Sequence, residues 1–456
     1  MKYRIFIVMS VLFNLILLKS GEIYGQVIFE ADKISITSDD HILFTPGYSI
    51  ENGTEVHTSI GPVEGECDIS YYFICTADSL ALIDLYHSLN GATWTDPWIL
   101  TDPISSWSGV ITDGNGRVTT IRLVDRQLTG ELSSSIGCLT ELVELDLRVN
   151  NITGSIPEEI GELDKLIYIK LNNNNLSGSI PGFIGLIGHL VHLELSNNNL
   201  SGRIPDQFRY LTSLSNLGLG GNELEESIPD IFQNLNNLEY LNLQQNNLIG
   251  SLPASIYSMS NLKSLTLSSN QIEGDISPNI VGLSSLTSLR LANNNFYSIP
   301  WEIGAMTNLT QINISHNSLA GIIPPEFAGL DNLKYLYLND NYLYGPIPPE
   351  IGNITALRNV QLHNNDLWGS LPSSLKNLVN LSYLKVSNNT LGGCYPVELS
   401  SLCSIITFDN AISDGNQFDS SWSSFCANQS GACSGTGNIQ NPEGTDHIVD
   451  KRSFRN

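Results

Sequence analysis

Leucine and isoleucine recur at fixed spacing through the middle of the chain. The pattern Leu142, Leu145, Leu147, Asn150, Ile152, Gly154, Ile156-Pro157 returns at Leu166, which is 166 − 142 = 24 residues later. One asparagine marks each repeat, and we call these residues the ladder asparagines: Asn150, Asn174, Asn198, Asn222, Asn246, Asn270, Asn294, Asn317, Asn341, Asn365 and Asn389. Arg126 holds the equivalent place in an opening repeat. The pattern therefore predicts twelve repeats over residues 118–397.

Each repeat has a pattern that a short strand explains. In the run LxxLxL, alternate side chains point to one face of a strand, so the leucines enter a core and the intervening residues face outward. The asparagine that follows can donate and accept hydrogen bonds, which suits a structural role at the buried turn after each strand. No repeat can bury its apolar edge alone. We expect an α/β solenoid whose curved array presents a parallel sheet on its concave face.

The end of each repeat resembles a known family. The ending LxGxIP, as in Leu176 to Pro181, is similar to the plant-specific class of leucine-rich repeats. That class includes receptor kinase ectodomains and polygalacturonase-inhibiting proteins. Glu226 in place of Gly, Ser277 in place of Pro and a repeat shortened to 23 residues after Asn294 depart from the pattern.

Residues 67–117 resemble the N-terminal cap of the same family. A helical pattern covers residues 79–86, and Trp94, Trp98 and Trp107 follow it. Ser105 and Ser106 stand where the plant cap usually has a cysteine pair. This departure and the segment Asn90-Gly91-Ala92-Thr93-Trp94 make the cap similar to that of secreted leucine-rich repeat proteins of Bacteroidota. The turn-forming sequence Asp113-Gly114-Asn115-Gly116 predicts a hairpin ahead of the first repeat.

The first 66 residues contain two further segments. Lys2 and Arg4 precede an apolar run from Ile5 to Leu18, which predicts a cleavable signal peptide over residues 1–25. A membrane anchor is the alternative, but the run is shorter than the roughly 20 residues that span a bilayer. Residues 26–66 alternate in polarity around turn signals and predict a small β-rich module similar to those of Bacteroidota surface proteins. The mature chain is then secreted or held at the cell surface without a transmembrane helix.

Seven cysteines in an exported chain predict disulfides. The candidates fall near the two ends of the array: Cys67, Cys75, Cys394, Cys403, Cys426 and Cys433. Cys138 stands apart and receives no assignment. A zinc site is the alternative, but no paired Cys or His spacing supports it. We place a C-terminal cap at residues 398–435 and a flexible tail at residues 436–456.

Charge excludes one class of partner. The chain has 46 acidic and 21 basic residues, so its formal net charge is −25. Phosphate backbones repel such a surface, which disfavours nucleic acid as a partner. The outward positions lie seven, six, four, two and one residues before each ladder position, which gives 12 × 5 = 60 concave positions. They carry eight bases and six acids, so the concave face is slightly positive at 8 − 6 = +2.

The last repeats supply the best binding candidates. Repeats seven to twelve hold five concave bases and one acid, Asp340, and the final three repeats add tyrosines. We name these residues the C-terminal concave patch: Lys334, Tyr335, Tyr337, Arg358, His363, Tyr383 and Lys385. Aromatic and arginine side chains are favoured binding anchors.

The sequence contains no catalytic triad, phosphate loop or metal-ligand set, so we expect no enzyme activity, cofactor or metal. The preferred interpretation is a monomeric recognition protein for a protein or surface glycan. The alternatives are a structural spacer or adhesin of the cell envelope and an inhibitor of an extracellular enzyme.

Overall fold

The computed structural model describes residues 78–406, 409–429 and 432–433, together with the backbone of six strands within residues 4–50. The chain forms two compact units, residues 1–76 and 77–456. Each unit is described by itself. Within the described residues, no helix combines the length and the apolar character that a membrane span requires.

The first unit contains β-strands. Strands β1 (Arg4–Val8), β2 (Asn14–Lys19), β3 (Glu22–Glu30) and β4 (Lys33–Ser38) form an antiparallel sheet in chain order. Strands β5 (Ile42–Phe44) and β6 (Tyr48–Ile50) form an antiparallel pair. The disulfide candidates Cys67 and Cys75 lie outside the described residues, as do the side chains of the predicted signal peptide. Both assignments remain predictions.

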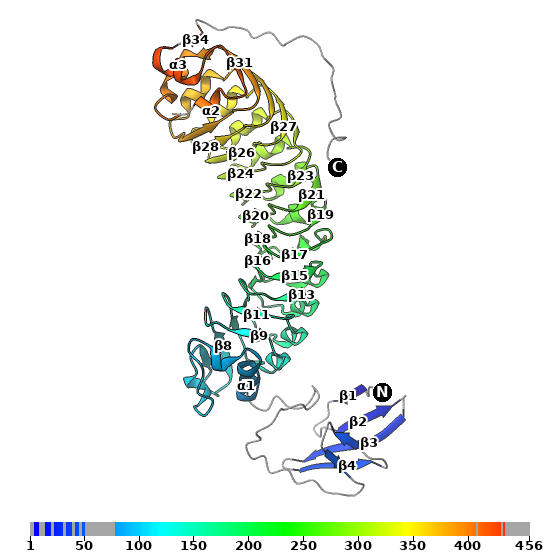
Figure 1. The fold of residues 1–456 in the computed structure, drawn as a ribbon. Helices are drawn as coiled ribbons and strands as arrows, with labels where there is room; N and C mark the ends of the chain where they lie inside the picture. Colours follow the sequence, from blue (N-terminus) through cyan, green and yellow to red (C-terminus); the bar gives the residue numbers. More distant parts are fainter. Residues whose placement is uncertain are drawn as a thin grey trace. The chain divides into compact units, whose positions relative to one another are not determined.

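A thirteen-stranded sheet organises the second unit and confirms the predicted solenoid (Figure 1). Twelve of its strands come from the twelve repeats and pair in parallel, while β7 pairs antiparallel with β8 at the N-terminal edge. The strands are β7 (Val110–Thr112), β8 (Val118–Arg122), β10 (Glu144–Asp146), β12 (Tyr168–Lys170), β14 (His192–Glu194), β16 (Asn216–Gly218), β18 (Tyr240–Asn242), β20 (Ser264–Thr266), β22 (Ser288–Arg290), β24 (Gln311–Asn313), β26 (Tyr335–Tyr337), β28 (Asn359–Gln361) and β30 (Tyr383–Lys385). This sheet follows the inner side of the arc in Figure 1 and forms the concave face.

The predicted hairpin joins β7 to β8. The Asp113 carboxylate accepts hydrogen bonds from the backbone N–H groups of Asn115 and Arg117 at 2.8 and 2.9 Å. These bonds close the turn and hold the pKa of Asp113 below its usual range.

Short strands follow the ladder position in each repeat and form smaller lateral sheets. They are β9 (Thr129–Glu131), β11 (Asn151–Thr153), β13 (Ser177–Ser179), β15 (Asn199–Gly202), β17 (Glu223–Leu224), β19 (Ile249–Gly250), β21 (Gln271–Gly274), β23 (Asn295–Phe296), β25 (Ala320–Gly321), β27 (Tyr342–Gly345), β29 (Asp366–Gly369), β31 (Thr390–Gly393) and β33 (Gln417–Phe418). This lateral pairing is interrupted between β11 and β13, between β17 and β19 beside Glu226, and between β23 and β25 at the shortened repeat. Two of the three breaks therefore coincide with departures from the sequence pattern.

A single 3-10 turn completes each repeat on the side away from the main sheet. These turns are η3 (Ser134–Cys138), η4 (Glu158–Glu162), η5 (Gly182–Leu186), η6 (Asp206–Tyr210), η7 (Phe232–Asn234), η8 (Ala254–Ser258), η9 (Pro278–Gly282), η10 (Trp301–Ala305), η11 (Pro325–Gly329), η12 (Pro349–Asn353), η13 (Ser373–Asn377) and η14 (Val397–Leu402). At η9 the departure from proline has a local use, because the Ser277 side chain accepts a hydrogen bond from the Asn279 N–H.

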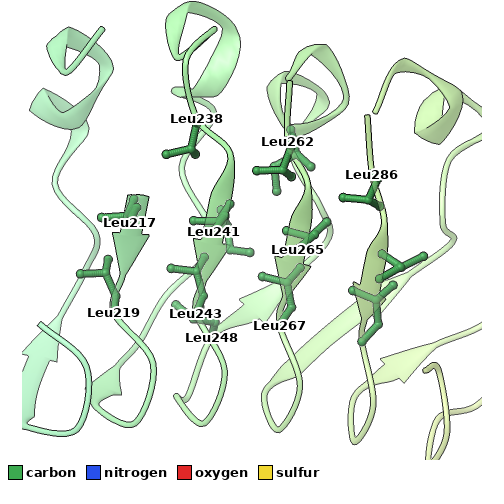
Figure 2. Close-up of a cluster of buried hydrophobic side chains, with 14 of the residues drawn as sticks. Leu217, Leu219, Leu238, Leu241, Leu243, Leu248, Leu262, Leu265, Leu267 and Leu286 are labelled. Carbon is green, nitrogen blue, oxygen red and sulfur yellow. The ribbon is translucent and has the colours of Figure 1, made fainter. Parts of the chain in front are cut away.

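The core is a continuous stack of leucine side chains. Figure 2 shows Leu217, Leu241 and Leu265 aligned on successive strands, with Leu219, Leu243 and Leu267 beside them. All six are at most 1% exposed. Each repeat thus buries its leucines against the repeats before and after it.

The ladder asparagines bridge neighbouring repeats. The Asn246 side-chain N–H group donates to the carbonyl oxygens of Leu219 and Leu243, both at 3.1 Å, while its Oδ1 accepts from the Leu224 N–H at 2.9 Å. Equivalent bonds recur from Asn150 to Asn389. They pair backbone groups that the leucine core shields from water.

We predict that Asn246→Ala lowers the free energy of unfolding by about 3 kcal/mol, because several buried backbone groups lose their partners. Urea denaturation would measure the change. The matched control is Asn247→Ala, since Asn247 is exposed and its change should stay within about 0.5 kcal/mol. Equal effects of the two substitutions would contradict the ladder role.

The N-terminal cap covers the first repeat. It contains α1 (Asp78–Ser88), η1 (Gly91–Thr93) and η2 (Ile104–Ser106). The buried Asp78 carboxylate accepts from the Val118 N–H and from Arg117 Nε. The tryptophans pack together: the rings of Trp98 lie 5.0 Å from those of Trp94 and 4.9 Å from those of Trp107. The cap therefore contributes both a polar partner and an apolar cover.

The C-terminal cap continues the ladder. It contains β32 (Tyr395–Pro396), α2 (Asp409–Ile412), α3 (Trp422–Asn428) and β34 (Ala432–Cys433). The Asn416 side chain donates to the Val386 carbonyl at 3.0 Å and accepts from the Leu391 N–H at 3.2 Å. Asn416 lies 416 − 389 = 27 residues after Asn389, so the 24-residue period did not identify it.

The C-terminal cap contains a disulfide. Cys403 and Cys426 are bonded to each other, as predicted candidates, with Cα atoms 5.4 Å apart. Cys394 is also disulfide-bonded, and so is Cys138, which the sequence had left without an assignment. The Cys433 side chain lies outside the described part of the chain.

The residue before each ladder position adopts a left-handed backbone. Most of these residues are Asn, Asp, Ser, Gln or His, but Val149 has φ of 60°. A β-branched side chain is strained there because its Cβ crowds the neighbouring backbone. Val149 is 44% exposed, so little packing offsets this strain.

We therefore predict that Val149→Asn raises the free energy of unfolding by about 1 kcal/mol, because asparagine tolerates the left-handed region. Chemical denaturation would measure it. Val379 is 77% exposed and has no positive φ, so Val379→Asn is the control and should change stability by no more than about 0.5 kcal/mol. A loss of stability in Val149→Asn would contradict the strain argument.

Candidate functional site

Parallel register aligns the outward side chains of the last repeats in columns. Tyr335, Asn359 and Tyr383 are directly paired across β26, β28 and β30. Tyr337, Gln361 and Lys385 form the next column in the same three strands. Neighbouring strands lie about 4.8 Å apart. The structure therefore brings the predicted patch together on one surface of three strands.

The three tyrosines present partly open rings. Tyr383 is 40% exposed, and the rings of Tyr335 and Tyr337 pack together with centroids 6.4 Å apart. Burial raises the pKa of Tyr337, and the adjacent Tyr335 raises it further. The phenol therefore stays neutral at physiological pH. A neutral phenol can donate a hydrogen bond to a ligand while its ring supplies apolar contact.

The bases of the patch have no acidic partner among the described residues. Within residues 78–406, no ion pair or side-chain hydrogen bond involves Lys334, Arg358 or Lys385. Lys334 and Arg358 are neighbours at one edge of the sheet, since the Arg358 N–H donates to the Lys334 carbonyl at 2.8 Å. Two positive charges thus face solvent side by side.

The bases at the other end of the concave face are neutralised. Glu144 lies 2.6 Å from an Arg122 nitrogen and 3.0 Å from Lys170 Nζ. Asp146 is 1% exposed and lies 3.5 Å from Arg148 Nε. The two bases hold the pKa of Glu144 below its usual range, against the opposing effect of burial.

The middle repeats continue this pairing. Lys263 Nζ lies 2.8 Å from a Glu239 oxygen. Arg290 donates to the Gln311 side-chain oxygen at 3.0 Å. Among the eight concave bases, those without a partner in the described part of the chain are confined to the last three repeats.

His363 lies in the patch but is largely enclosed. It is 8% exposed, and its Nδ1 is buried without a hydrogen-bond partner in the described structure. Its Nε2 lies 3.8 Å from Asp340 Oδ2, and His316 Nε2 lies 3.4 Å from the same oxygen. The other six residues of the C-terminal concave patch are therefore better placed to contact a ligand.

The Asp340 carboxylate is held by neighbouring amides. Asn339 and Asn364 each donate a side-chain hydrogen bond to it at 2.6 Å. These bonds and the nearby histidines keep its pKa below the usual value although burial opposes this. Asp340 is thus a fixed negative charge beside the patch.

Sequence reasoning missed the middle of the patch. Asn359 and Gln361 lie on β28 between the tyrosines and Lys385, and the Gln361 amide donates to Asn359 Oδ1 at 3.3 Å. Their outward positions were identifiable from the repeat, but polar amides are common throughout the array. Only the register shows that they lie between the aromatic and basic residues.

No group of three or more His, Cys, Asp or Glu side chains in the described part is placed to hold a metal. His192, like His363, has a pKa lowered mainly by burial. For His363 the positive charges of Lys385 and His316 lower it further, while Asp340 opposes them.

The lowered pKa of His363 makes stability depend on pH. The unfolded imidazole, with a pKa of about 6.5, binds a proton more readily than the folded one. The contribution of neutral His363 to folding stability is therefore complete above about pH 6.5 and is lost as the pH falls through the pKa of the folded state. We predict that His363→Asn reduces the loss of thermal stability between about pH 7 and 5.5.

Melting temperatures across this interval would test the prediction. The matched variant is Asn359→Ala, which removes no titrating group and should keep the pH slope of the original chain. An unchanged slope in His363→Asn would contradict the assignment.

Comparisons with known proteins agree with this architecture. Family models described as leucine rich repeat match residues 227–272 and 284–343, and residues 141–163, 165–186 and 189–211. A leucine-rich repeat protein of Leptospira interrogans is 30% identical, with a TM-score of 0.53, and the match covers 67% of this chain and 80% of that protein.

Two solved receptor complexes are also similar. The PEPR1–AtPEP1 structure matches with a TM-score of 0.64 and 28% identity, over 75% of this chain and 55% of that one. The ectodomain of the Arabidopsis receptor kinase HAESA, in complex with an extended IDA peptide hormone, matches with a TM-score of 0.62 and 30% identity, over 75% and 61%. Phytosulfokine receptor 2 of Arabidopsis thaliana is 38% identical over 76 residues, which are 16% of this chain and 7% of that receptor. This chain thus spans less than two thirds of each receptor.

Proposed function

The chain belongs to the leucine-rich repeat proteins, and from that premise we propose that it is a secreted or cell-surface recognition protein. It has no enzymatic activity of its own, and it binds a protein or peptide partner with the concave face of its last three repeats. It acts as a monomer.

One observation carries this proposal. Lys334, Arg358 and Lys385 have no acidic partner within residues 78–406, whereas the bases at the N-terminal end are paired with Glu144 and Asp146. Unpaired like charges repel one another, and a partner that approaches them removes this repulsion. Tyrosines in the same strands add apolar area and hydroxyl groups, a combination favoured at binding surfaces.

The similar proteins support the same class of function. PEPR1 is in complex with AtPEP1, and HAESA is in complex with a peptide hormone. The predicted signal peptide over residues 1–25 supports export, and the resemblance of the N-terminal cap to that of secreted Bacteroidota proteins supports such a lineage. A surface glycan is the second ligand class, because tyrosine rings also pack against sugars.

Photo-crosslinking tests the place of binding. A photoreactive phenylalanine analogue replaces Tyr383 in one variant and Trp301 in another, since Trp301 is 61% exposed in η10, away from the main sheet. With extracellular material from the source cells, we expect a discrete adduct from position 383 and none from position 301. Adducts confined to position 301 would place the interface elsewhere and contradict the proposal.

The captured partner allows a quantitative test. We predict that Tyr337→Ala combined with Tyr383→Ala weakens binding at least tenfold, because removal of two anchor residues costs roughly 1–2 kcal/mol or more each. Calorimetry would measure the dissociation constant. Tyr210→Ala is the control, since Tyr210 is 57% exposed in η6. Unchanged affinity in the double variant would exclude the patch.

A further inference from the structure

We propose that the C-terminal concave patch recognises an acidic peptide segment in extended conformation, a specificity that rests on the proposed function. The partner's carboxylates pair with Lys334 and Arg358 at one edge and with Lys385 further along the strands. The residues between these bases contact the rest of the segment.

The spacing of the bases defines the ligand. Arg358 precedes β28, and Lys385 ends the adjacent strand β30, three positions further along the repeat. At about 3.3 Å per residue, this separates the two charged positions by roughly 10 Å. An extended peptide in the polyproline II conformation rises about 3.1 Å per residue and returns to the same face every third residue, so it spans nearly the same distance in three residues. Acidic residues at positions i and i+3 of the partner therefore match the two ends of the patch.

The residues between the bases suit a peptide backbone. Asn359 and Gln361 offer amide donors and acceptors, and the tyrosine hydroxyls make no hydrogen bond in the described part of the chain. Main-chain N–H and C=O groups need partners of both kinds when they leave water. Tyr335 and Tyr383 flank Asn359 on the neighbouring strands. A peptide segment lying along β28 would thus contact the side-chain amides of this strand, with the aromatic rings of the neighbouring strands on either side.

A densely charged polyanion fits this surface less well. Asp340 lies on the same face, and its amide partners keep it ionised. Neutral positions also separate Lys385 from the neighbouring bases Lys334 and Arg358, so the three bases do not form a continuous basic track. Closely spaced sulfates would therefore lie against the Asp340 carboxylate and the tyrosines, which is unfavourable. A peptide with two separated carboxylates avoids both contacts.

Defined probes test this specificity on the whole mature chain. The first probe is a fluorescein-labelled twelve-residue peptide with Glu at every third position among Ser and Gly. The second has Gln in place of each Glu, and the third is a heparin-derived hexasaccharide. Fluorescence anisotropy in low salt should show saturable binding of the Glu peptide, at least tenfold weaker binding of the Gln peptide, and weakening of the Glu peptide by added salt.

Charge-reversed variants locate the binding. Lys334→Glu combined with Arg358→Glu should weaken the Glu peptide at least tenfold, with an unchanged melting temperature because both side chains reach solvent. Lys376→Glu is the matched control, since Lys376 is an exposed base of the same region in η13, outside the main sheet. It should leave binding within about twofold, because distant exposed charges are screened.

Three outcomes would overturn the inference: equal binding of the Glu and Gln peptides, no binding of either, or tighter binding of the hexasaccharide that the double variant abolishes. The last result would assign the surface to a sulfated glycan. Failure here is separable from failure of the proposed function. If a partner is captured at position 383 but its affinity is unchanged by the charge reversals, only the acidic specificity is refuted. If no partner is captured at that position, the recognition surface itself is refuted.

Discussion

The buried asparagine ladder is the interaction on which the rest of this structure depends. A solenoid of short strands encloses many backbone groups at its turns, and water cannot reach them there. Each ladder asparagine pairs carbonyl groups of two successive repeats and one N–H group of the repeat before it, as Asn246 does for Leu219, Leu243 and Leu224. Because two of these three bonds cross to the preceding repeat, the ladder fixes the stacking distance and the register that the leucine core alone would leave loose.

The two ends show what an interrupted ladder requires. At the start, Arg126 replaces asparagine and instead binds Asp96 and Ser108 in the cap, while Asp78 accepts from the first strand. At the other end, Asn416 supplies one further set of ladder bonds from within the cap, and the Cys403–Cys426 disulfide joins cap segments. The caps therefore satisfy backbone groups as well as covering apolar surface.

The fixed register also allows the concave surface to differ from one repeat to the next. Every outward position recurs at the same place on successive strands, so substitution there changes the surface without changing the core. The N-terminal strands use this freedom for acid and base pairs that neutralise one another, as Glu144 does with Arg122 and Lys170. The last three strands carry bases, tyrosines and amides, and their bases have no such acidic partners in the described part of the chain. The N-terminal part of the concave face is therefore a surface of structural ion pairs, whereas the C-terminal part leaves its charges available to a partner.

The sequence by itself determined the solenoid, its twelve repeat strands, the positions of the ladder asparagines and the outward positions of the concave face, because a strict period assigns each residue to the inside or the outside. The period could not identify Asn416, because its spacing differs, or the disulfide bond of Cys138, because a hydrophobic repeat does not specify which cysteines are bonded. It also placed His363 on the concave face without showing that neighbouring side chains enclose it. Only the tertiary structure decided which bases are paired, because an ion pair such as Lys170 with Glu144 joins residues of different repeats at a distance set by strand register and side-chain conformation.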